Sequence, residues 1–324
     1  MKLQILITQY LETEKVIKPL LDSINIQQNI DLENDIEVVI MNDGSDVKLS
    51  KSFLEQFSFP IHYIHADHIG LSGCRQRLLD ISNADYIMFC DADDMFLSNI
   101  ALFIIFQAIK KWPDIINCAY VSEQKNLKTG EINLLKYERG EERLQAKIFR
   151  RQYLIEKNIY WPAEMRRHCE TFFNALAFKS TKNIIYYSQP LYLWKWNNHS
   201  ISREDSKYSI KTFLHLIGAN ISLVEEFLKR KMINEAKFYL GTMIYQTYYT
   251  INHPEWKKPE NLKYIYVTEK CFQYLYINYK TLFEDIPTPM RRQIIKNVKN
   301  GIMREGELLE TITFNDWIKH IEQL

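Results

Sequence analysis

The sequence lacks an excess of charge of either sign. Its 41 lysine and arginine residues balance 40 aspartate and glutamate residues, which leaves a formal net charge of +1. A balance this close gives no support for a nucleic-acid or membrane surface spread over the whole protein. Basic runs such as "KIFRRQYLIEK" and "MRRQIIKNVKNGIMR" do occur. We interpret them as solvated faces, because most local charge runs are of this kind.

The sequence also has few cysteines, and none are paired in a motif. The five are odd in number, scattered and without a CxxC spacing: Cys74, Cys90, Cys118, Cys169 and Cys271. This usage excludes a cysteine-based zinc site and a disulfide scaffold. It favours a reducing compartment, and we therefore expect a cytoplasmic protein.

No hydrophobic run is long enough to span a membrane. The longest, "MFLSNIALFIIFQAI", falls short of the ~20 apolar residues that a transmembrane helix needs. The opening "MKLQILITQY" turns polar too soon for a signal peptide. We expect no transmembrane segment, and peripheral contact with the inner face of a membrane is left open. A hydrophobic content of 46% excludes wholesale disorder.

The first 120 residues alternate between strand and helix patterns. Short β-rich runs end at turn residues, and each is followed by a segment with apolar residues at helical spacing. The expected strands are "LQILIT", "IEVVIM", "IHYIHA", "DYIMFC" and "DIINCAYVSE". This alternation predicts an α/β fold with a mostly parallel, Rossmann-like sheet and helices on both faces.

The pattern changes after residue 120. We expect a hairpin around Thr129 and Gly130, a helix over 142–158 and a strand-rich segment over 183–196. From about residue 206 onward, apolar residues recur at three-to-four spacing. The sequence therefore predicts an α/β domain over 1–205 and an all-helical domain over 206–324.

Three of the expected strands end in polar clusters, "TQY", "NDGS" and "DADD". Open α/β sheets bind ligands at the carboxyl ends of their strands. In an extended chain Asp91 and Asp93 point to the same side, where two carboxylates can hold Mg²⁺ or Mn²⁺. Taken alone, this D-x-D is better explained as part of a loop or a helix cap. Asp43 equally fits a turn aspartate before glycine, and Arg75, at a helix start that attracts anions, equally fits a surface arginine.

Five ordered segments resemble the inverting family-2 glycosyltransferases, which have the GT-A fold. They are "ILITQYLETEKVIKPLLDSI", "IEVVIMNDGSD", "GLSGCRQRLLDISNADYIMFCDADD", "HCETFFNALAF" and "QPLYLWKWNNHSISRE". The resemblance covers roughly residues 3 to 205. The chain departs from the family pattern at Leu11, at Asn42 and at Cys169-Glu170, where the family carries Asn, Asp and Glu-Asp.

The resemblance implies a nucleotide-sugar donor, most simply a UDP-sugar, and a Mn²⁺ or Mg²⁺ ion. Asp93 would bind the metal, Asp91 the ribose or metal-bound water, and Glu170 would be the general base. Without the resemblance, Glu170 is better explained as a carboxylate that balances a helix dipole. Tyr10 would stack on the base and Asp43 would accept a hydrogen bond from it. The full set of implied donor-nucleotide contacts is Thr8, Gln9, Tyr10, Glu12, Asp43, Arg75, Asp91 and Ala92.

The stretch "WNNHSISR" carries further candidates. His199 is expected to complete the metal shell or to contact a phosphate, and Arg203 to pair with the diphosphate. A loop that tightens into a helix cap is the alternative. Trp161 and Trp196, with Trp194, are candidates for stacking on a sugar or acceptor, although buried aromatics more often belong to a core.

Other functions stay open at this point. A nucleotidyltransferase also uses a strand-end D-x-D, but "TQYLETEK" lacks the glycine-rich loop such an enzyme needs. A non-catalytic carbohydrate-binding protein on the same fold is the third hypothesis. The expected acceptor is a hydroxyl of a bacterial cell-surface glycan, with a protein or a modified base of phage DNA as alternatives. We expect the helical domain to serve acceptor binding or homo-oligomer formation.

Overall fold

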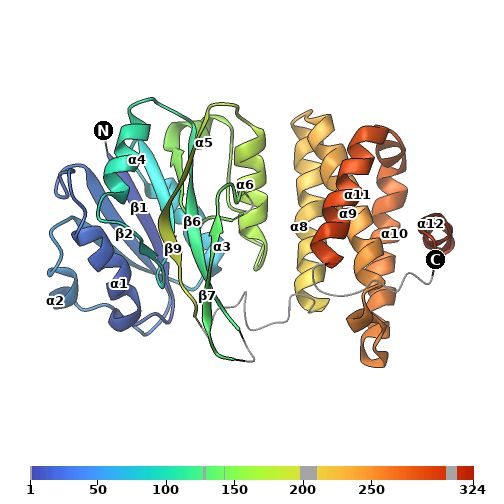
Figure 1. Ribbon diagram of the computed structural model, residues 1–324, viewed down its shortest axis with the longest axis horizontal. Helices are drawn as coiled ribbons and strands as arrows, with labels where there is room; N and C mark the ends of the chain where they lie inside the picture. Colours follow the sequence, from blue (N-terminus) through green and yellow to red (C-terminus); the bar gives the residue numbers. More distant parts are fainter. Residues whose placement is uncertain (1, 127–128, 142, 198–209, 304–311) are drawn as a thin grey trace. The chain divides into compact units, whose positions relative to one another are not determined.

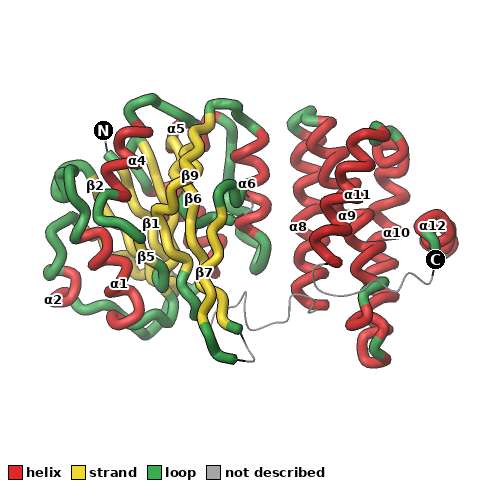
Figure 2. Tube along the Cα trace, viewed as in Figure 1, coloured by secondary structure: helices red, strands yellow, loops and turns green. Residues whose placement is uncertain are grey.

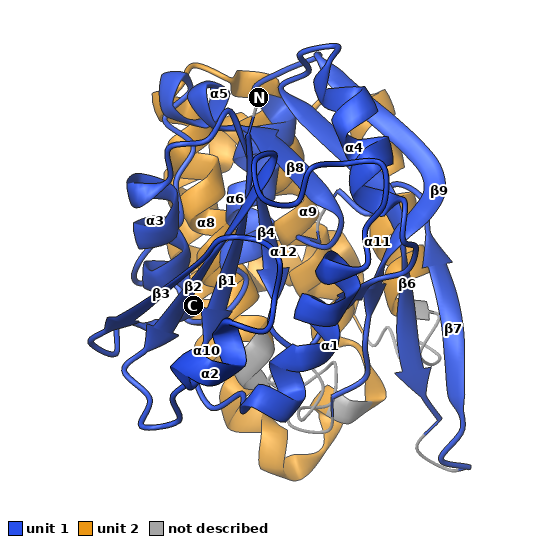
Figure 3. Ribbon diagram, turned by 90° about the vertical axis from the view of Figure 1, so that its left-hand side faces the viewer, with its two compact units in different colours: residues 1–204 blue, residues 205–324 orange. Residues whose placement is uncertain are grey.

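The computed structural model describes residues 2–126, 129–141, 143–197, 210–303 and 312–324. The chain forms two compact units, residues 1–204 and residues 205–324 (Figure 3). The first is an α/β unit and the second is helical (Figure 2). This division agrees with the α/β and helical character expected for the two parts of the sequence.

The first half of the sheet is parallel. Strand β1 (Leu3–Gln9) lies between β2 (Ile36–Asp43) and β4 (Tyr86–Asp91), and β3 (Ile61–Ala66) flanks β2 at the edge (Figure 3). Thr8 lies opposite Met41 on one side and Asp91 on the other. The carboxyl ends of β1, β2 and β4 therefore meet at one edge of the sheet.

The second half of the sheet mixes directions. Strand β8 (Lys147–Arg150) pairs antiparallel with β4 and with β6 (Ile115–Lys125). Strand β6 also pairs parallel with β9 (Ile184–Trp194) and antiparallel with β7 (Ile132–Tyr137), as expected for the hairpin around Gly130. The short β5 (Met95–Phe96) pairs antiparallel with β9.

The prediction of a helix over 142–158 is wrong. This segment contains β8 and then only a short helix, α5 (Arg151–Glu156). The apolar pair Ile148 and Phe149 explains the difference. Ile148 packs in the core on one face of the sheet, and Phe149 packs edge-on against Phe173. Neighbouring residues that are buried on opposite faces need the two-residue repeat of a strand.

Helices cover both faces of the sheet, as predicted (Figure 1). Apolar side chains of α1 and α4 pack on one face in a common core with the odd-numbered residues of β1. Helix α3 and helix α6 lie on the other face, where Phe89 and Phe173 meet. The helices of this unit are α1 (Glu14–Asn25), α2 (Lys51–Leu54), α3 (Gly70–Ile81), α4 (Ala101–Ile109), α5 and α6 (Cys169–Lys179).

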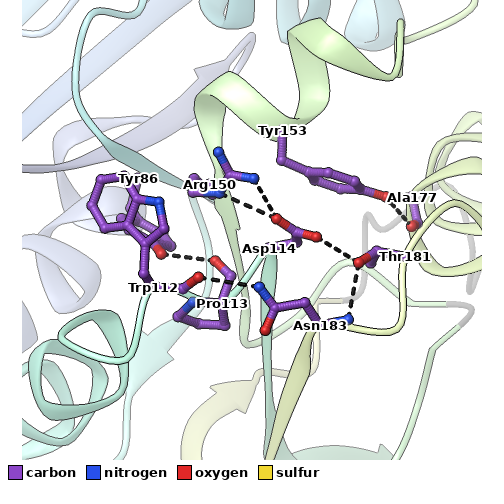
Figure 4. A network of polar contacts seen from close by, with 9 residues as sticks. All are labelled: Tyr86, Trp112, Pro113, Asp114, Arg150, Tyr153, Ala177, Thr181 and Asn183. Atoms are coloured by element: carbon purple, nitrogen blue, oxygen red, sulfur yellow. Dashed lines mark hydrogen bonds and ion pairs between the residues drawn. The ribbon is translucent and has the colours of Figure 1, made fainter.

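A polar network fixes the carboxyl end of α6 (Figure 4). The hydroxyl of Tyr153 donates to the carbonyl oxygen of Ala177 in the last turn of the helix. Just beyond the helix, the hydroxyl of Thr181 donates to Asp114, which also accepts hydrogen bonds from Arg150. This anchoring limits how far the opposite, amino end of α6 can move.

The helical unit has its own core. Its helices are α8 (Ile210–Lys229), α9 (Ile233–Ile251), α10 (Leu262–Glu284), α11 (Thr288–Met303) and α12 (Phe314–Gln323), with the short 3₁₀ turns η1 (Pro254–Lys257) and η2 (Pro259–Asn261). Trp256, Trp317 and Tyr248 are buried at its centre. Across the described parts of both units, every helix is too short or too polar to cross a membrane.

Candidate active site

The acidic residues of "DADD" lie at the carboxyl end of β4, beside the end of β1. Asp91 is the last residue of the strand and Asp94 is fully buried. Within β4, Ile87, Phe89 and Asp91 alternate with residues of the α1 core, and therefore face α3 and α6. The predicted strand-end position of the acids is confirmed, and Ala92 is buried among them.

Arg75 joins two of the candidate residues. It projects from α3 and is only 2% exposed. Its Nη2 atom lies 2.7 Å from Asp91 Oδ1, and its Nη1 atom lies 3.3 Å from Glu170 Oε1. Glu170 is in the first turn of α6, so three separate elements bring these charges together. A guanidinium holds two carboxylates well because its donors form a planar fork.

Burial and charge act in opposite directions on this cluster. Burial opposes the charged form of Arg75, but Asp91 and then Glu170 outweigh it and raise the pKa of the guanidinium. Burial raises the pKa of Asp91 to about 6, against the lowering effect of Arg75, and Glu170 and Asp93 add to the rise. Burial likewise raises the pKa of Asp94 well above its usual value. The site therefore concentrates negative charge that only partly has a cationic partner.

A second group of residues surrounds Asp43 at the end of β2. Its Oδ1 atom accepts hydrogen bonds from the backbone N–H groups of Ile69 (2.7 Å) and Gly70 (3.1 Å) at the start of α3. Its Oδ2 atom lies 3.2 Å from Nδ1 of His68. The rings of His68 and Tyr10 have centroids 5.0 Å apart, and Tyr10 is 44% exposed. Two exposed rings beside a fixed carboxylate form a suitable place for a planar base.

Gly44 makes the approach of His68 possible. It has a left-handed φ of 70°, and a Cβ atom placed on it would lie 2.5 Å from the backbone nitrogen of His68. Heavy atoms of a real side chain do not come this close to a backbone atom. The glycine of "NDGS" therefore serves both the turn and the close packing of the two loops.

Neighbouring polar side chains hold these loops in place. The amide of Gln9 donates to the carbonyl oxygens of Glu12 and Val47, and its Oε1 accepts from the hydroxyl of Tyr63. Glu12 accepts a hydrogen bond from the backbone N–H of Tyr10 at 2.7 Å. Gln9 and Glu12, expected as donor contacts, thus position the loop that carries Tyr10. Asn42, where the family has Asp, accepts from the backbone N–H of Ser45 and donates to Val47.

The carboxylate of Asp93 has different surroundings from those of Asp91 and Asp94. It is half-buried, and its Oδ2 atom accepts a hydrogen bond from the side chain of Asn197 at 2.8 Å. Both oxygens of Asp91 have partners, because Gln145 donates to Oδ2. Oδ1 of Asp94 accepts from the backbone N–H of Lys195. Among the described residues, no three acid, histidine or cysteine side chains are arranged to enclose a metal.

Of the expected aromatic platforms, Trp161 is corrected by the structure. It is 1% exposed, stacks on Phe173 with centroids 4.2 Å apart, and lies beneath Arg75, whose Cζ is 4.9 Å from its ring. Its bulk belongs in the core, where it supports the guanidinium, and no face is open to a sugar. Trp196 is half-buried next to Asn197, and its backbone N–H donates to Glu123. His199 and Arg203 lie outside the described residues.

Three residues of the site had no place in the sequence-based prediction: His68, Asn197 and Gln145. Asn197 stood within the quoted "WNNHS", but no pattern distinguished it. Gln145 fell in the segment assigned to a helix, which concealed that it lies next to Asp91. Nothing in the spacing of His68 separated it from a loop histidine.

Comparison with known proteins identifies the family of the chain. Residues 4–179, more than half of the chain, match the family model of glycosyl transferase family 2. The protein belongs to this family.

Two relatives share limited identity with the chain. One is the uncharacterized glycosyltransferase EpsJ of Bacillus subtilis (strain 168), 24% identical over 210 residues, a match that covers 58% of this chain and 60% of the relative. Another is the uncharacterized glycosyltransferase YibD of Escherichia coli (strain K12), 23% identical over 196 residues, with 52% and 55% covered. The match thus extends over little more than half the length of each relative.

Solved structures of S. aureus TarS have a similar fold. One aligns over 92% of this chain and 55% of its own, with a TM-score of 0.59 and 14% identity. TarS 1-349 in complex with UDP-GlcNAc aligns over 97% of this chain and 100% of its own, with a TM-score of 0.55 and 15% identity. At this level of identity the likeness shows the fold.

Proposed function

We propose that this protein is an inverting, metal-dependent glycosyltransferase that moves a sugar from a UDP-sugar to an acceptor hydroxyl. The observation that carries the proposal is the Arg75 bridge between Asp91, at the end of β4, and Glu170, at the start of α6. It brings a carboxylate at the strand ends, where α/β sheets bind nucleotides, and a second carboxylate from α6 into one site. An inverting transfer needs such a second carboxylate as a base near the donor site.

The base of the nucleotide is proposed to bind beside Asp43 and the end of β1. Tyr10, with His68 beside it, would stack on the base, and Oδ2 of Asp43 would accept a hydrogen bond from its ring N–H. Uracil carries such a donor, which favours UDP over nucleotides without one. The UDP complexes of the similarly folded TarS support this choice. Thr8, Asp91 and Ala92 are proposed as further contacts of the donor nucleotide, and Gln9 and Glu12 hold the loop that carries Tyr10.

Asp93 is the proposed ligand of a Mn²⁺ or Mg²⁺ ion. The donor set fits such an ion, because hard cations in nucleotide enzymes take one or two carboxylates and complete their shell with phosphate oxygens and water. When bound, the ion would stabilise negative charge on the departing diphosphate. His199 and Arg203 remain proposed as a further metal or phosphate ligand and as a diphosphate partner.

Glu170 is the proposed general base. One oxygen of the Glu170 carboxylate takes the proton of the acceptor hydroxyl. At the same time the oxygen of the acceptor attacks the anomeric carbon, and the bond between that carbon and the diphosphate breaks. Arg75 keeps Glu170 aimed across the site and adds positive charge near the donor. Trp196 stays proposed as an acceptor or sugar contact.

The acceptor is proposed to be a hydroxyl of a bacterial cell-surface glycan, the default for this family. The helical unit is proposed to serve acceptor binding or self-association. A protein or a modified base in phage DNA would need the same base and donor site, so acceptor screening decides among them. The nucleotidyltransferase alternative loses its support with the family match.

Two assays test this function in order. UDP-sugars are first incubated with the protein and Mn²⁺, and release of UDP is measured, because many transferases slowly transfer the sugar to water. The active donor is then offered with glycan, peptide and DNA acceptors, and the anomeric configuration of the product is determined. Absence of UDP release from every donor, or a product with retained configuration, would contradict the proposal.

A further inference from the structure

Two acids clamp the chain where it leaves strand β9. This strand lies between β6 and β5 in the sheet, and its pairing with β6 ends at Trp194. Beyond that pair, the backbone N–H of Lys195 donates to Oδ1 of Asp94 (3.0 Å), directly before β5. The next backbone N–H, that of Trp196, donates to Oε2 of Glu123 (2.7 Å) on β6. Hydrogen bonds to carboxylates are strong, so these two fix the course of the chain past the end of β9.

Asn197, the next residue, donates from its side chain to Asp93. Its Nδ2 atom lies 2.8 Å from Oδ2 of Asp93, and both side chains are half-buried. An ionised carboxylate can only accept hydrogen bonds, so the amide must present its nitrogen to Asp93. Because the two preceding residues, Lys195 and Trp196, are clamped, the amide approaches Asp93 from a fixed direction.

The three acids of "DADD" differ in what holds them. Asp91 has a cationic partner, because Arg75 binds its Oδ1 atom. Asp94 is fully buried. Asp93 is half-buried, and among the described residues its carboxylate has a single hydrogen bond, the one from Asn197, and no ion pair. A neutral amide leaves the negative charge of Asp93 uncompensated, and a hard cation binds to a charge of this kind.

The carboxylate of Asp93 needs support to bind a metal well. Asp93 lies in the turn between β4 and β5, outside the pairing of either strand. Ordering a free side chain costs conformational entropy, which lowers the affinity of a site that must order its ligand on binding. A hydrogen bond that orients the carboxylate beforehand removes part of this cost, and carboxylates that bind metals are commonly held in this way. An amide suits the task because it adds no positive charge that would repel the ion.

We propose that Asn197 is a positioning residue for the metal site: its amide keeps the Asp93 carboxylate oriented for a Mn²⁺ or Mg²⁺ ion. The hydrogen bonds to Asp94 and Glu123 hold Asn197 in place for this task. This inference rests on the proposed role of Asp93 as metal ligand. Asn197 acts on the ion through Asp93 and is not itself a ligand.

The test measures the affinity for Mn²⁺ directly, in the presence of UDP, from the loss of the free-ion signal in electron paramagnetic resonance. Asn197→Leu removes the donor and keeps a similar side-chain volume. We expect the dissociation constant for Mn²⁺ to rise about 10–100-fold, the usual cost of losing a hydrogen bond to a metal ligand. The affinity for UDP measured in EDTA should stay unchanged, because Asn197 acts on the Asp93 carboxylate and not on the base.

Asn34→Leu is the matched control. Nδ2 of Asn34 also lies 2.8 Å from a carboxylate oxygen, Oδ2 of Asp31, at an exposed position between α1 and β2. This substitution should leave the affinity for Mn²⁺ at the wild-type level. The double variant Asn197→Leu/Asp93→Asn should bind Mn²⁺ no more weakly than Asp93→Asn alone, because residues that act as a unit are not additive. A further loss in the double variant would contradict the inference.

A purely structural role for Asn197 would lower stability without a specific loss of Mn²⁺ binding. A folded Asn197→Leu protein with wild-type affinity for Mn²⁺ therefore overturns the inference. So does an equal loss of UDP affinity in EDTA, which would indicate a general disturbance of the strand ends. Asn197→Ala supplies the same comparison should leucine prevent folding.

Asp93→Asn is measured alongside to separate this inference from the proposed function. If wild-type protein with UDP leaves the free Mn²⁺ signal unchanged, the proposed metal dependence is wrong, and the role of Asn197 with it. If Asp93→Asn binds Mn²⁺ like the wild type, the proposed metal ligand is wrong. If its affinity collapses while Asn197→Leu matches the Asn34→Leu control, only the role of Asn197 is wrong.

Discussion

Arg75 and Glu170 are 95 residues apart in the chain, yet Nη1 of the arginine lies 3.3 Å from Oε1 of the glutamate. The same guanidinium holds Asp91 at 2.7 Å. This bridge connects α3, β4 and the start of α6, and the opposite end of α6 is anchored to Tyr153 (Figure 4). The proposed base, Glu170, lies on a helix that is held at both ends.

Replacing Glu170 with Gln should reduce sugar transfer by two to four orders of magnitude. Glutamine keeps the size and the hydrogen bond to Arg75 but cannot accept the proton, and general-base catalysis contributes about 10²–10⁴-fold. The measurement is kcat for transfer, with the affinity for UDP determined by calorimetry. We expect that affinity to stay within a factor of two or so, since this carboxylate faces the acceptor.

Shortening the same residue gives the sharper comparison. Family members usually carry Asp at this position, and in this chain the longer Glu170 side chain reaches Arg75. Glu170→Asp should therefore also lose much of the rate, because the base must come within about 2.6–3.2 Å of the acceptor hydroxyl. Near-normal transfer by Glu170→Gln would place the base elsewhere, and Asp94, Glu164 and His168 would be examined next.

Asp93→Asn should abolish the stimulation of UDP-sugar hydrolysis by Mn²⁺. The amide keeps a similar shape beside Asn197 but lacks the negative charge that binds a hard cation. Hydrolysis is measured across a Mn²⁺ titration. Asp85→Asn is the control, because Asp85 is an exposed acid beside the other end of β4. An Asp93→Asn protein that responds to Mn²⁺ like the control would remove Asp93 from the metal site.

Asp43→Asn should weaken UDP binding about tenfold while the fold survives. The side-chain oxygen of asparagine can still accept the hydrogen bonds from the N–H groups of Ile69 and Gly70, so the start of α3 keeps its cap. The atom that replaces Oδ2 becomes an N–H donor facing the ring N–H of uracil, and a lost charge-assisted hydrogen bond costs on the order of 1.5–3 kcal/mol. Calorimetry with UDP measures the change. Equal affinity in mutant and wild type would reduce Asp43 to a turn residue.

The sequence was sufficient for the parallel half of the fold and for the acids at its strand ends. "IEVVIMNDGS" and "DYIMFCDADD" combine a buried strand with its terminal ligand residues, so element and site are read from the same local pattern. The position of Glu170 came from the family resemblance, since no local signal distinguishes it from a residue that balances a helix dipole.

The segment around Lys147 could not be predicted in the same way. "QAKIFRRQYL" has apolar residues that fit a helix repeat, and only the sheet, closed by β4 on one side and β6 on the other, makes it a strand. Ala146 has a left-handed φ of 59° just before β8, a conformation that no alanine prefers. Tertiary pairing imposes it. Because strand β8 was not predicted, the contacts of Lys147 and Gln145 could not be predicted either.

Gly44→Ala should lower stability and UDP affinity more than Gly70→Ala. Both glycines have left-handed φ angles, 70° and 79°, so both substitutions carry a similar backbone cost of about 1–2 kcal/mol. Only at position 44 does the new Cβ meet a backbone atom, the nitrogen of His68 at 2.5 Å, and space is open around position 70. Denaturant unfolding and UDP calorimetry on the pair isolate the clash. Equal losses of stability and UDP affinity at the two sites would show that the loop with His68 moves away from position 44 at little cost in free energy.

The free-energy cost of Lys147 should depend on pH in a defined direction. Its pKa is lowered from 10.5 to about 7 in the folded protein, first by burial. Between these values the unfolded chain binds the proton and the folded protein does not, so the stability attached to this group rises with pH from about 7 to about 10.5.

Below about pH 7 the lysine is charged in both states, and the full cost of its buried charge is present. Lys147→Met has no such group. We therefore expect the variant to exceed the wild type in free energy of unfolding by the largest margin near pH 6. The margin should shrink by up to about 1.4 kcal/mol per pH unit above pH 7. Urea unfolding at pH 6, 7, 8 and 9 gives the free energy of unfolding of both proteins. Subtracting one from the other removes the contribution of every group that titrates equally in the two. A margin independent of pH would mean that Lys147 keeps its ordinary pKa in the folded protein.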